Sequence, residues 1–177
     1  MAKYKIKSLD EITLAALDFF SKNEPPHFDH HKFKFPLVIG SGNAYCTGKI
    51  IFSGQAAIYA SESDFKEIVK QYEPLIKDKT ITEAVVISAS GEKDSVWELE
   101  LAKKSGLKTI LLTCSPNSTA AKIADQVLTY HKLPEPYTYN TSTYLGMILS
   151  ATSEKAEIIR KNLKKIKIPK KFKQYQA

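Results

Sequence analysis

The stretch Val85-Val86-Ile87-Ser88-Ala89-Ser90-Gly91-Glu92-Lys93-Asp94 decides how this chain is expected to fold. Its first three residues are β-branched and apolar, which is typical of a strand buried on both faces of a parallel sheet. Small hydroxyl residues and a glycine follow, and a helical pattern begins after Asp94. In such a turn, backbone N–H groups, hydroxyls and a helix N-terminus can approach an anion. The stretch therefore predicts either a phosphate-binding loop or an ordinary tight turn between a strand and a helix.

A second turn of small residues, Gly40-Ser41-Gly42-Asn43-Ala44-Tyr45, follows the short apolar run at 35–39. Gly40 and Gly42 resemble the start of a dinucleotide fingerprint, but Tyr45 stands where the third glycine would be. The next predicted strand also lacks the acidic residue that such a site needs at its end. The turn therefore gives only weak support for an NAD site and leaves open that it binds a smaller anion.

Apolar runs alternate with helical patterns along the whole chain. Strands are expected at 35–39, 56–60, 84–88, 109–113 and 126–130, and helices at 8–20, 45–53, 61–72, 94–106, 119–124 and 143–163. This alternation predicts an α/β fold of three layers, αβα, around a five-stranded parallel sheet with right-handed crossovers. Because ligands bind outside the carboxyl ends of such strands, the two small-residue loops are expected to form one anion site.

The net charge of +7 is concentrated at the end of the chain, since residues 161–177 hold seven lysines and no acid. We expect three parts: an N-terminal helix and connection at 1–34, one domain at 35–160 and a lysine-rich tail at 161–177. The balanced body, with Arg160 as its single arginine, argues against a nucleic-acid-binding domain. The tail is interpreted as solubilising or as the end of an amphipathic helix, with binding to an acidic surface as the alternative.

The cysteines and histidines give no metal-binding pattern. Cys46 and Cys114 lie far apart and are expected to be free thiols, as in a reducing cytoplasm. His27, His30 and His31 cluster in a loop, but no carboxylate or cysteine stands at a ligand spacing from them. We therefore expect neither a metal nor a cofactor, and leave open an active-site role for one histidine beside a neighbouring subunit. The sequence holds no apolar stretch of membrane-spanning length, and the protein is expected in the cytoplasm.

Over roughly residues 35–150, the order and spacing of these motifs resemble the sugar isomerase (SIS) domain, a phosphosugar-binding fold. Residues 86–92 resemble its phosphate loop, a strand followed by Ser-x-Ser-Gly-Glu-Thr, and residues 40–45 resemble its loop Gly-x-Gly-x-Ser-Tyr. Residues 102–113 and 118–124 also fit its pattern, with Asp125 at a family aspartate. The resemblance implies a flavodoxin-like topology and a sugar phosphate bound by eight residues: Gly42, Asn43, Ser88, Ala89, Ser90, Gly91, Lys93 and Thr141.

A narrower resemblance concerns Glu135 and the isomerase domain of the glucosamine-6-phosphate synthases. In that domain a glutamate is followed six residues later by a threonine, and here Thr141 follows Glu135 at that spacing, with Ser142 in place of a lysine. The resemblance implies that Glu135 moves a proton between sugar carbons in an aldose–ketose interconversion. A carboxylate with a raised pKa in a water-poor site suits that step. Alternatively Glu135, flanked by two prolines, caps the segment C-terminal to it.

Two positions depart from the family pattern. Lys93 stands where the family has a threonine, and Ala44 where it has a serine, so two hydroxyl donors to phosphate are missing. Lys93 either replaces one of them with a charge or is a solvated lysine at a helix start. We therefore expect a phosphosugar isomerase or, alternatively, a non-catalytic sugar-phosphate sensor. The family further implies a homodimer or homotetramer.

Overall fold

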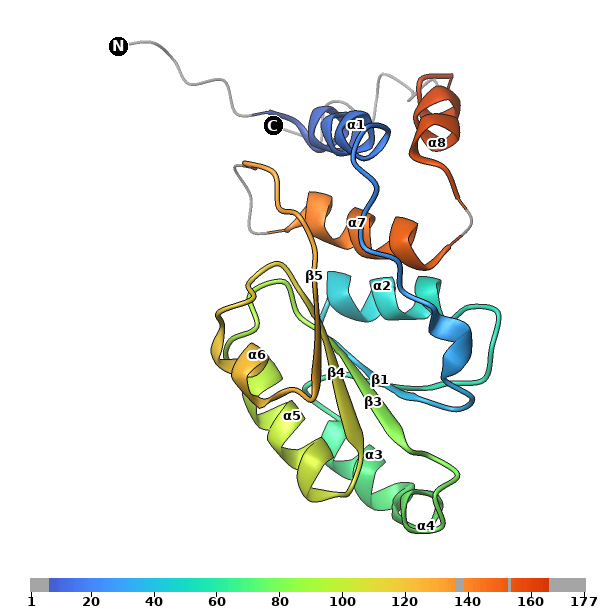
Figure 1. The fold of residues 1–177 in the computed structure, drawn as a ribbon, viewed down its shortest axis with the longest axis vertical. Helices are drawn as coiled ribbons and strands as arrows, with labels where there is room; N and C mark the ends of the chain where they lie inside the picture. The colour runs from blue at the N-terminus through green and yellow to red at the C-terminus, as the bar shows by residue number, and fades with distance from the viewer. Residues whose placement is uncertain (1–6, 136–138, 153, 166–177) are drawn as a thin grey trace.

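The computed structural model describes residues 7–135, 139–152 and 154–165 and contains one parallel sheet (Figure 1). Its strands are β1 (Leu37–Ile39), β2 (Ile58–Ala60), β3 (Glu83–Ile87), β4 (Lys108–Thr113) and β5 (Gln126–Thr129). They lie in the order β2-β1-β3-β4-β5, and every neighbouring pair is parallel. This is the flavodoxin-like order. The predicted α/β class and the five-stranded parallel sheet are confirmed.

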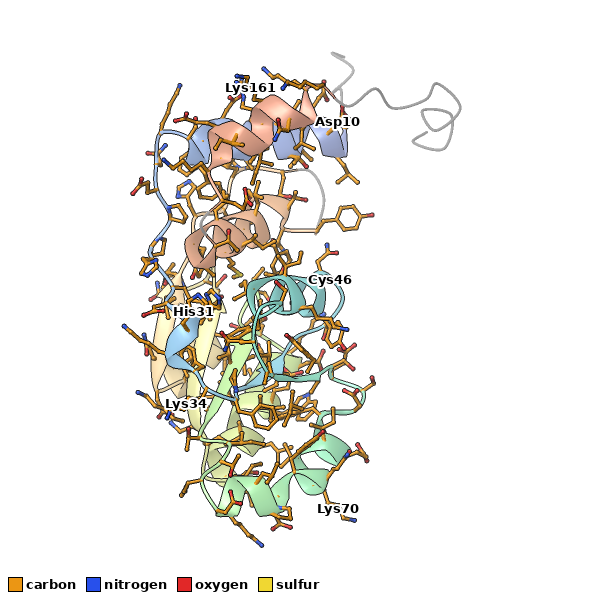
Figure 2. All side chains as sticks on the ribbon, turned by 90° about the vertical axis from the view of Figure 1, so that its right-hand side faces the viewer. Asp10, His31, Lys34, Cys46, Lys70 and Lys161 are labelled. Atoms are coloured by element: carbon orange, nitrogen blue, oxygen red, sulfur yellow. The ribbon has the colours of Figure 1, made fainter. Side chains whose placement is uncertain are left out.

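Helices cover both faces of the sheet (Figure 1). One face carries α3 (Phe65–Gln71), α4 (Glu73–Lys77), α5 (Asp94–Lys104) and α6 (Thr119–Ile123); the other carries α2 (Asn43–Ile51) and α7 (Thr141–Ala151). Two further helices, α1 (Leu9–Phe20) and α8 (Ala156–Leu163), lie on the side of α7 that faces away from the sheet. The molecule is therefore long, with Lys161 of α8 near one end and Lys70 of α3 at the other (Figure 2).

The central strand β3 carries the core of both helical layers. Val86 packs in the cluster with α3, α5 and α6, whereas Val85 and Ile87 pack in the cluster with α2 and α7. All three side chains are buried, as expected for a strand covered on both faces. The pairs Val85–Val38 and Val85–Ile110 fix the register with β1 and β4. The buried β3 thus delivers the loop after Ile87 to the carboxyl edge of the sheet.

The first helix, expected at 8–20, begins with a capping box. The Ser8 side chain caps the first turn, and the Ser8 N–H donates to the Glu11 carboxylate at 2.9 Å. Leu17 and Phe20 then pack against α7, where Gly146 leaves room for the Phe20 ring. Among the described residues no helix is long and apolar enough to cross a membrane.

Two predicted helices differ from the structure. The expected single helix at 143–163 is wrong: the backbone is extended at Thr152 (φ −110°, ψ 162°) and at Lys155, so α7 and α8 are separate. The break lets Ala156 and Ile159 pack in the cluster with α1. A straight continuation of α7 would place these two residues away from α1. The helix expected from Ser61 begins only at Phe65, after a turn at 62–64 in which the Asp64 carboxylate accepts the Ser61 N–H at 2.6 Å.

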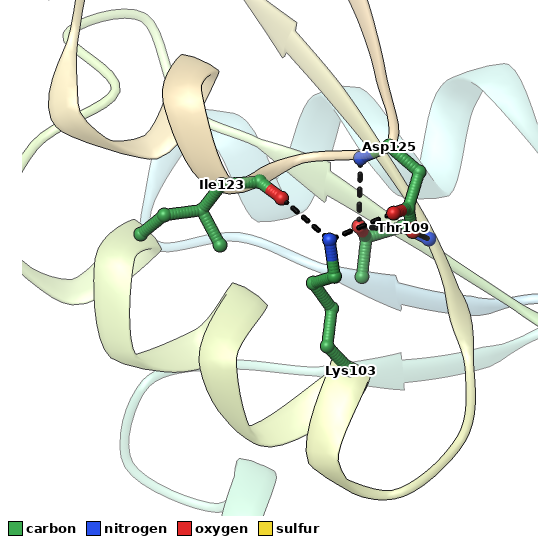
Figure 3. A network of polar contacts seen from close by, with 4 residues as sticks. All are labelled: Lys103, Thr109, Ile123 and Asp125. Atoms are coloured by element: carbon green, nitrogen blue, oxygen red, sulfur yellow. Dashed lines mark hydrogen bonds and ion pairs between the residues drawn. The ribbon is translucent and has the colours of Figure 1, made fainter.

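A polar network closes the opposite edge of the sheet, where β4 and β5 begin (Figure 3). The Asp125 carboxylate accepts the N–H and the hydroxyl of Thr109 at 2.8 and 2.9 Å, and the Lys103 ammonium at 2.7 Å. The same ammonium donates to the Ile123 carbonyl at 2.8 Å. The lysine contact, followed by the hydrogen bonds from Thr109, lowers the pKa of Asp125 to about 2. Asp125 therefore ties α5 to the start of the two strands, far from the carboxyl edge.

Candidate functional site

The candidate site lies where the strand order switches direction. β1 pairs with β2 on one side and with β3 on the other, so the loops after β1 and β3 leave the sheet next to each other. Such a switch point is where ligands bind in open parallel sheets. A cavity of about 150 Å³ lies between these loops, α5 and α7. Its wall includes Gly40, Ser41, Ala44, Ser88, Ser90, Glu92, Lys93, Asp94, Glu98 and Tyr144.

The loop after β3 is held in one conformation by its own backbone. The Gly91 N–H donates to Ser88 Oγ at 3.1 Å, which leaves the Ser88 hydroxyl proton as a donor for another group. Gly91 has a φ of 64°, and a Cβ there would overlap Ser118 Oγ. Only glycine fits a position that combines this φ with so close a neighbour.

The segment after β4 supports the same loop. The Ala89 carbonyl accepts the Thr113 hydroxyl at 2.9 Å, and the Gly91 carbonyl accepts the Ala120 N–H at 3.0 Å. The Glu92 carboxylate accepts the Thr119 N–H at 2.9 Å. The segment after β4 therefore holds the backbone of the loop that carries Ser88 and Ser90 before any ligand arrives, which reduces the entropy lost on binding.

The two helices that start at this edge add donors. α2 begins after Gly42 and α5 after Lys93, and the first N–H groups of a helix lack partners within it. Together with the helix dipole they favour an anion near either helix start. The Lys93 side chain is exposed and lines the cavity, so the charge in place of the family threonine lies at the candidate site.

Glu98 is a residue of this cavity that the sequence interpretation missed. It lies on the buried face of α5 with Ser95 and Leu99, and only 2% of it is exposed. Its Oε1 has no hydrogen-bond partner among the described residues. Burial, followed by the nearby carboxylates of Asp94 and Glu62, raises the pKa of Glu98 to about 7. The sequence did contain a signal for it, because Glu98 falls on the same face of the predicted helix as Leu99 and Ala102, which are apolar and buried.

The first loop approaches the segment before α7. The Ser41 hydroxyl donates to the Glu62 carboxylate, and the Asn43 side-chain amide donates to the Tyr139 carbonyl at 3.4 Å. Gly42 and Asn43 are exposed at the start of α2 and are not among the described residues that line the cavity. They lie on the surface between the cavity and the chain that leads into α7.

Glu135 is bound to the N-terminus of α7. Its Oε2 accepts the Thr141 N–H at 2.8 Å, and its Oε1 accepts the N–H and the hydroxyl of Ser142 at 3.2 and 2.7 Å. This is the capping arrangement, the alternative to a catalytic role. Glu135 and Thr141 are not among the described residues of the cavity wall, to which α7 contributes Tyr144. Burial raises the pKa of the Tyr144 hydroxyl, which lies beside the Ala89 backbone.

The predicted site residues thus fall into three groups. Ser88, Ser90 and Lys93 line one cavity, Ala89 and Gly91 shape the same loop, and Gly42, Asn43, Glu135 and Thr141 lie outside the wall.

The histidine loop lies elsewhere. His30 is buried with its ring 3.9 Å from that of His31, and burial, followed by His31, lowers the pKa of His30. Figure 2 shows His31 and Cys46 well apart on the molecule. In the part of the chain that the structure describes, no group of three or more histidine, cysteine or acidic side chains could hold a metal ion. Most of the lysine-rich tail lies outside the described residues.

Comparison with known proteins shows which domain family the sequence matches. The sequence model of the SIS domain matches residues 37–153. A glutamine–fructose-6-phosphate aminotransferase of Thermococcus kodakarensis is 30% identical over 133 residues, which are 75% of this chain and 22% of the relative. The chain therefore spans about a fifth of the length of the curated relatives it matches.

Solved structures agree at the level of the fold. The Vibrio vulnificus NanR protein complexed with ManNAc-6P has a TM-score of 0.52 at 17% identity, over 84% of this chain and 53% of that one. The C-terminal domain of glucosamine-fructose-6-phosphate aminotransferase from Francisella tularensis has a TM-score of 0.50 at 16% identity, over 93% and 47%. One of these similar folds thus comes from an enzyme, and the other from a protein solved with a bound sugar phosphate.

Proposed function

The chain belongs to the SIS domain family, and from that premise we propose that it binds a sugar phosphate in the cavity between the 40–45 and 88–94 loops. The observation that carries the proposal is the loop after β3. There Ser88 accepts the Gly91 N–H, its hydroxyl proton remains as a donor, and the loop leads into the N-terminus of α5. A phosphoryl group is the ligand that such hydroxyls, backbone N–H groups and a helix start bind best.

The names of the similar proteins support the same ligand class. The Thermococcus relative is named for fructose 6-phosphate, and the NanR structure holds ManNAc-6P. Both ligands are phosphorylated six-carbon sugars, so we propose a hexose phosphate. A cytoplasmic location and a homodimer or homotetramer complete this proposal.

Isomerisation of the bound sugar is the first of two candidate functions for this site. In this function Glu135 transfers a proton between adjacent sugar carbons. The role follows from the resemblance, in which Glu135 matches the family glutamate because Thr141 lies six residues after it. The Asn43–Tyr139 contact supports it, since this contact holds the segment before α7 against the first loop of the cavity. A sugar whose phosphate lies at Ser88 would have to extend from the cavity to reach that carboxylate.

Binding without turnover, as in a sensor, is the second candidate function. The geometry of Glu135 favours it, because both carboxylate oxygens are used by the N-terminus of α7. A base that already accepts three hydrogen bonds is poorly placed to take a proton from carbon. The absence of the family hydroxyls at positions 44 and 93, which are alanine and lysine here, also favours binding without turnover.

Calorimetric titration with fructose 6-phosphate tests the binding proposal. We expect wild type to bind, unphosphorylated fructose not to bind, and Ser88→Ala and Ser90→Ala each to weaken binding by about tenfold. The matched control is Ser53→Ala, an exposed serine outside the cavity. Equal affinities for the two serine variants and wild type would show that the ligand binds elsewhere.

Proton exchange separates the two candidate functions. An isomerase exchanges a carbon-bound proton of fructose 6-phosphate with solvent deuterium, which NMR detects, and loses the exchange in Glu135→Gln. A sensor binds the sugar without exchange. Exchange that persists in Glu135→Gln would remove the catalytic assignment of Glu135.

A further inference from the structure

The Glu98 carboxyl is an unusual component of an anion-binding cavity. It lies on the second turn of α5, forms part of the cavity wall, and is almost fully buried. Its Oε1 has no partner among the described residues. An ionised carboxylate in this position would be desolvated without compensation, which strongly favours the neutral acid.

The charges around Glu98 act in the same direction. Asp94, one turn earlier on α5, and Glu62, on the loop after β2, are the carboxylates that disfavour its ionisation. Each is fixed by a neighbour: Asp94 accepts the Trp97 indole N–H at 3.4 Å, and Glu62 accepts the Ser41 hydroxyl.

Cations on the elements packed around α5 do not offset these charges. Lys66 of α3 lies over the Trp97 ring, and Lys122 of α6 acts on Glu92 at the surface. The described residues of the cavity wall include the lysine Lys93 and three acidic residues, Glu92, Asp94 and Glu98, and α7 contributes the neutral Tyr144. A phosphoryl dianion would therefore enter a cavity whose buried acid has to be uncharged to admit it.

We propose that Glu98 has to be protonated for the cavity to accept a phosphoryl group, so that each anion bound above neutral pH takes up one proton at this residue. The inference rests on the proposed function, because it concerns the same cavity and the same ligand class. Glu98 would then contribute to ligand selection. A dianion binds together with a proton at this residue, and the affinity of the cavity for dianions falls as the pH rises.

The direction of the pH dependence follows from the charges. Without ligand, the pKa of Glu98 lies at about 7, and a bound dianion raises it further. Well below pH 7 the acid is neutral with or without ligand, so it does not alter the affinity. Above pH 7 the ligand-free protein loses this proton while the complex retains it, and the affinity falls.

Titration calorimetry with fructose 6-phosphate at pH 7.0 and 8.5 tests the inference, since sugar phosphates with a second pKa of about 6 remain dianions over this range. We expect the affinity of wild type to fall by about tenfold between the two values. Glu98→Gln keeps the shape but cannot ionise, and its affinity is expected to be the same at both. Glu100→Gln, the same change at an exposed position of α5, serves as the control and is expected to retain the wild-type fall.

Proton uptake provides a readout that needs no variant. Titration of wild type at pH 8 in two buffers of different ionisation enthalpy is expected to show uptake of nearly one proton per ligand, about 0.8. Binding by wild type with no uptake, or a Glu98→Gln affinity that falls as in wild type, would overturn the inference while the proposed function stands. Absence of binding at every pH in wild type and in Glu98→Gln would overturn both, and binding by Glu98→Gln alone would support the role of the Glu98 charge.

Discussion

Gly42 and Lys93 have the same backbone conformation, with φ and ψ of 52° and −115° in Gly42 and 54° and −115° in Lys93. Each is the last residue before a helix that starts at the carboxyl edge of the sheet. Glycine adopts this conformation readily, whereas a residue with a Cβ is strained there by about 1–3 kcal/mol. The strain therefore lies in the candidate binding loop, at the residue that carries the cation of the cavity wall.

Replacing Lys93 by glycine separates the backbone from the charge. We expect Lys93→Gly to raise the free energy of unfolding by about 1 kcal/mol, as strain is relieved, and to weaken fructose 6-phosphate binding several-fold, as a cation is lost. Lys79→Gly is the matched control, since Lys79 also has a positive φ (67°) but lies outside the cavity. Urea unfolding and calorimetry measure the two effects. Unchanged binding in Lys93→Gly would indicate a solvated lysine that does not contact the ligand.

A second comparison of two positions tests the close packing of the loop after β3. Gly91→Ala combines a positive φ with overlap of its Cβ and Ser118 Oγ, and we expect it to lower the free energy of unfolding by about 2–4 kcal/mol. Gly42→Ala has a similar φ but open space around its Cβ, so about 1 kcal/mol is expected. The difference between the variants, measured by urea unfolding, reports the contact with Ser118. Equal losses would mean that the loop can move away from Ser118.

Local pattern was sufficient to predict the sheet and the two loops. The apolar run at Val85–Ile87 can be satisfied only by burial on both faces, and each run of this kind became a strand. The ends of helices depend on contacts that no local pattern contains. α7 stops at Ala151 because Ala156 and Ile159 pack beside α1, more than 130 residues earlier in the chain. No glycine or proline marks that break.

The sequence predicts a residue of the candidate site only where a polar residue directly follows a predicted strand. Ser88 and Ser90 follow their strand directly, so the sheet alone places them at its carboxyl edge. Glu98 reaches the same cavity from the second turn of a helix, and its burial depends on packing from several elements. Glu135 admitted two interpretations, because the direction of its carboxyl group is set by the N-terminus of α7 and not by the residues next to it.

The hydrogen bonds of Glu135 predict a structural effect independent of catalysis. Glu135→Gln places an amide NH₂ among groups that donate, the N–H of Thr141 and the N–H and hydroxyl of Ser142. We expect a loss of about 1–2 kcal/mol in the free energy of unfolding. The control is Glu154→Gln, an exposed glutamate beyond the other end of α7. A stability equal to wild type would show that the carboxylate does not cap α7 in solution, and would leave its role to be decided by the proton-exchange measurement.

Asp125 predicts how the protein responds to acid. Its pKa is lowered to about 2 from an ordinary value of 3.8, so its contribution to stability is present above pH 4 and is lost as the pH falls toward 2. The side chain is 36% exposed, so solvent screening reduces the effect, and we expect Asp125→Asn to lose about 1–2 kcal/mol at pH 7. Thermal melting of both proteins from pH 7 to pH 2.5 measures it, and the two melting temperatures are expected to converge in acid. A constant difference would show that the loss comes from packing.

Glu98 predicts the opposite dependence on pH. Its pKa is raised from 4.5 to about 7, so between these two values the acid is neutral in the folded protein and ionised in the unfolded chain. Wild type therefore loses stability as the pH rises from 4.5 to 7, and its stability then stays level. Glu98→Gln has no proton to lose. We expect it to equal wild type within about 0.5 kcal/mol at pH 4.5 and to exceed it at pH 8 by about 2 kcal/mol, with about 3 kcal/mol as the upper bound. Urea unfolding at both pH values, without ligand, measures the difference. If the variant were no more stable than wild type at pH 8, the carboxylate would have found a partner or water in solution, and the charge that is expected to oppose an incoming anion would already be compensated.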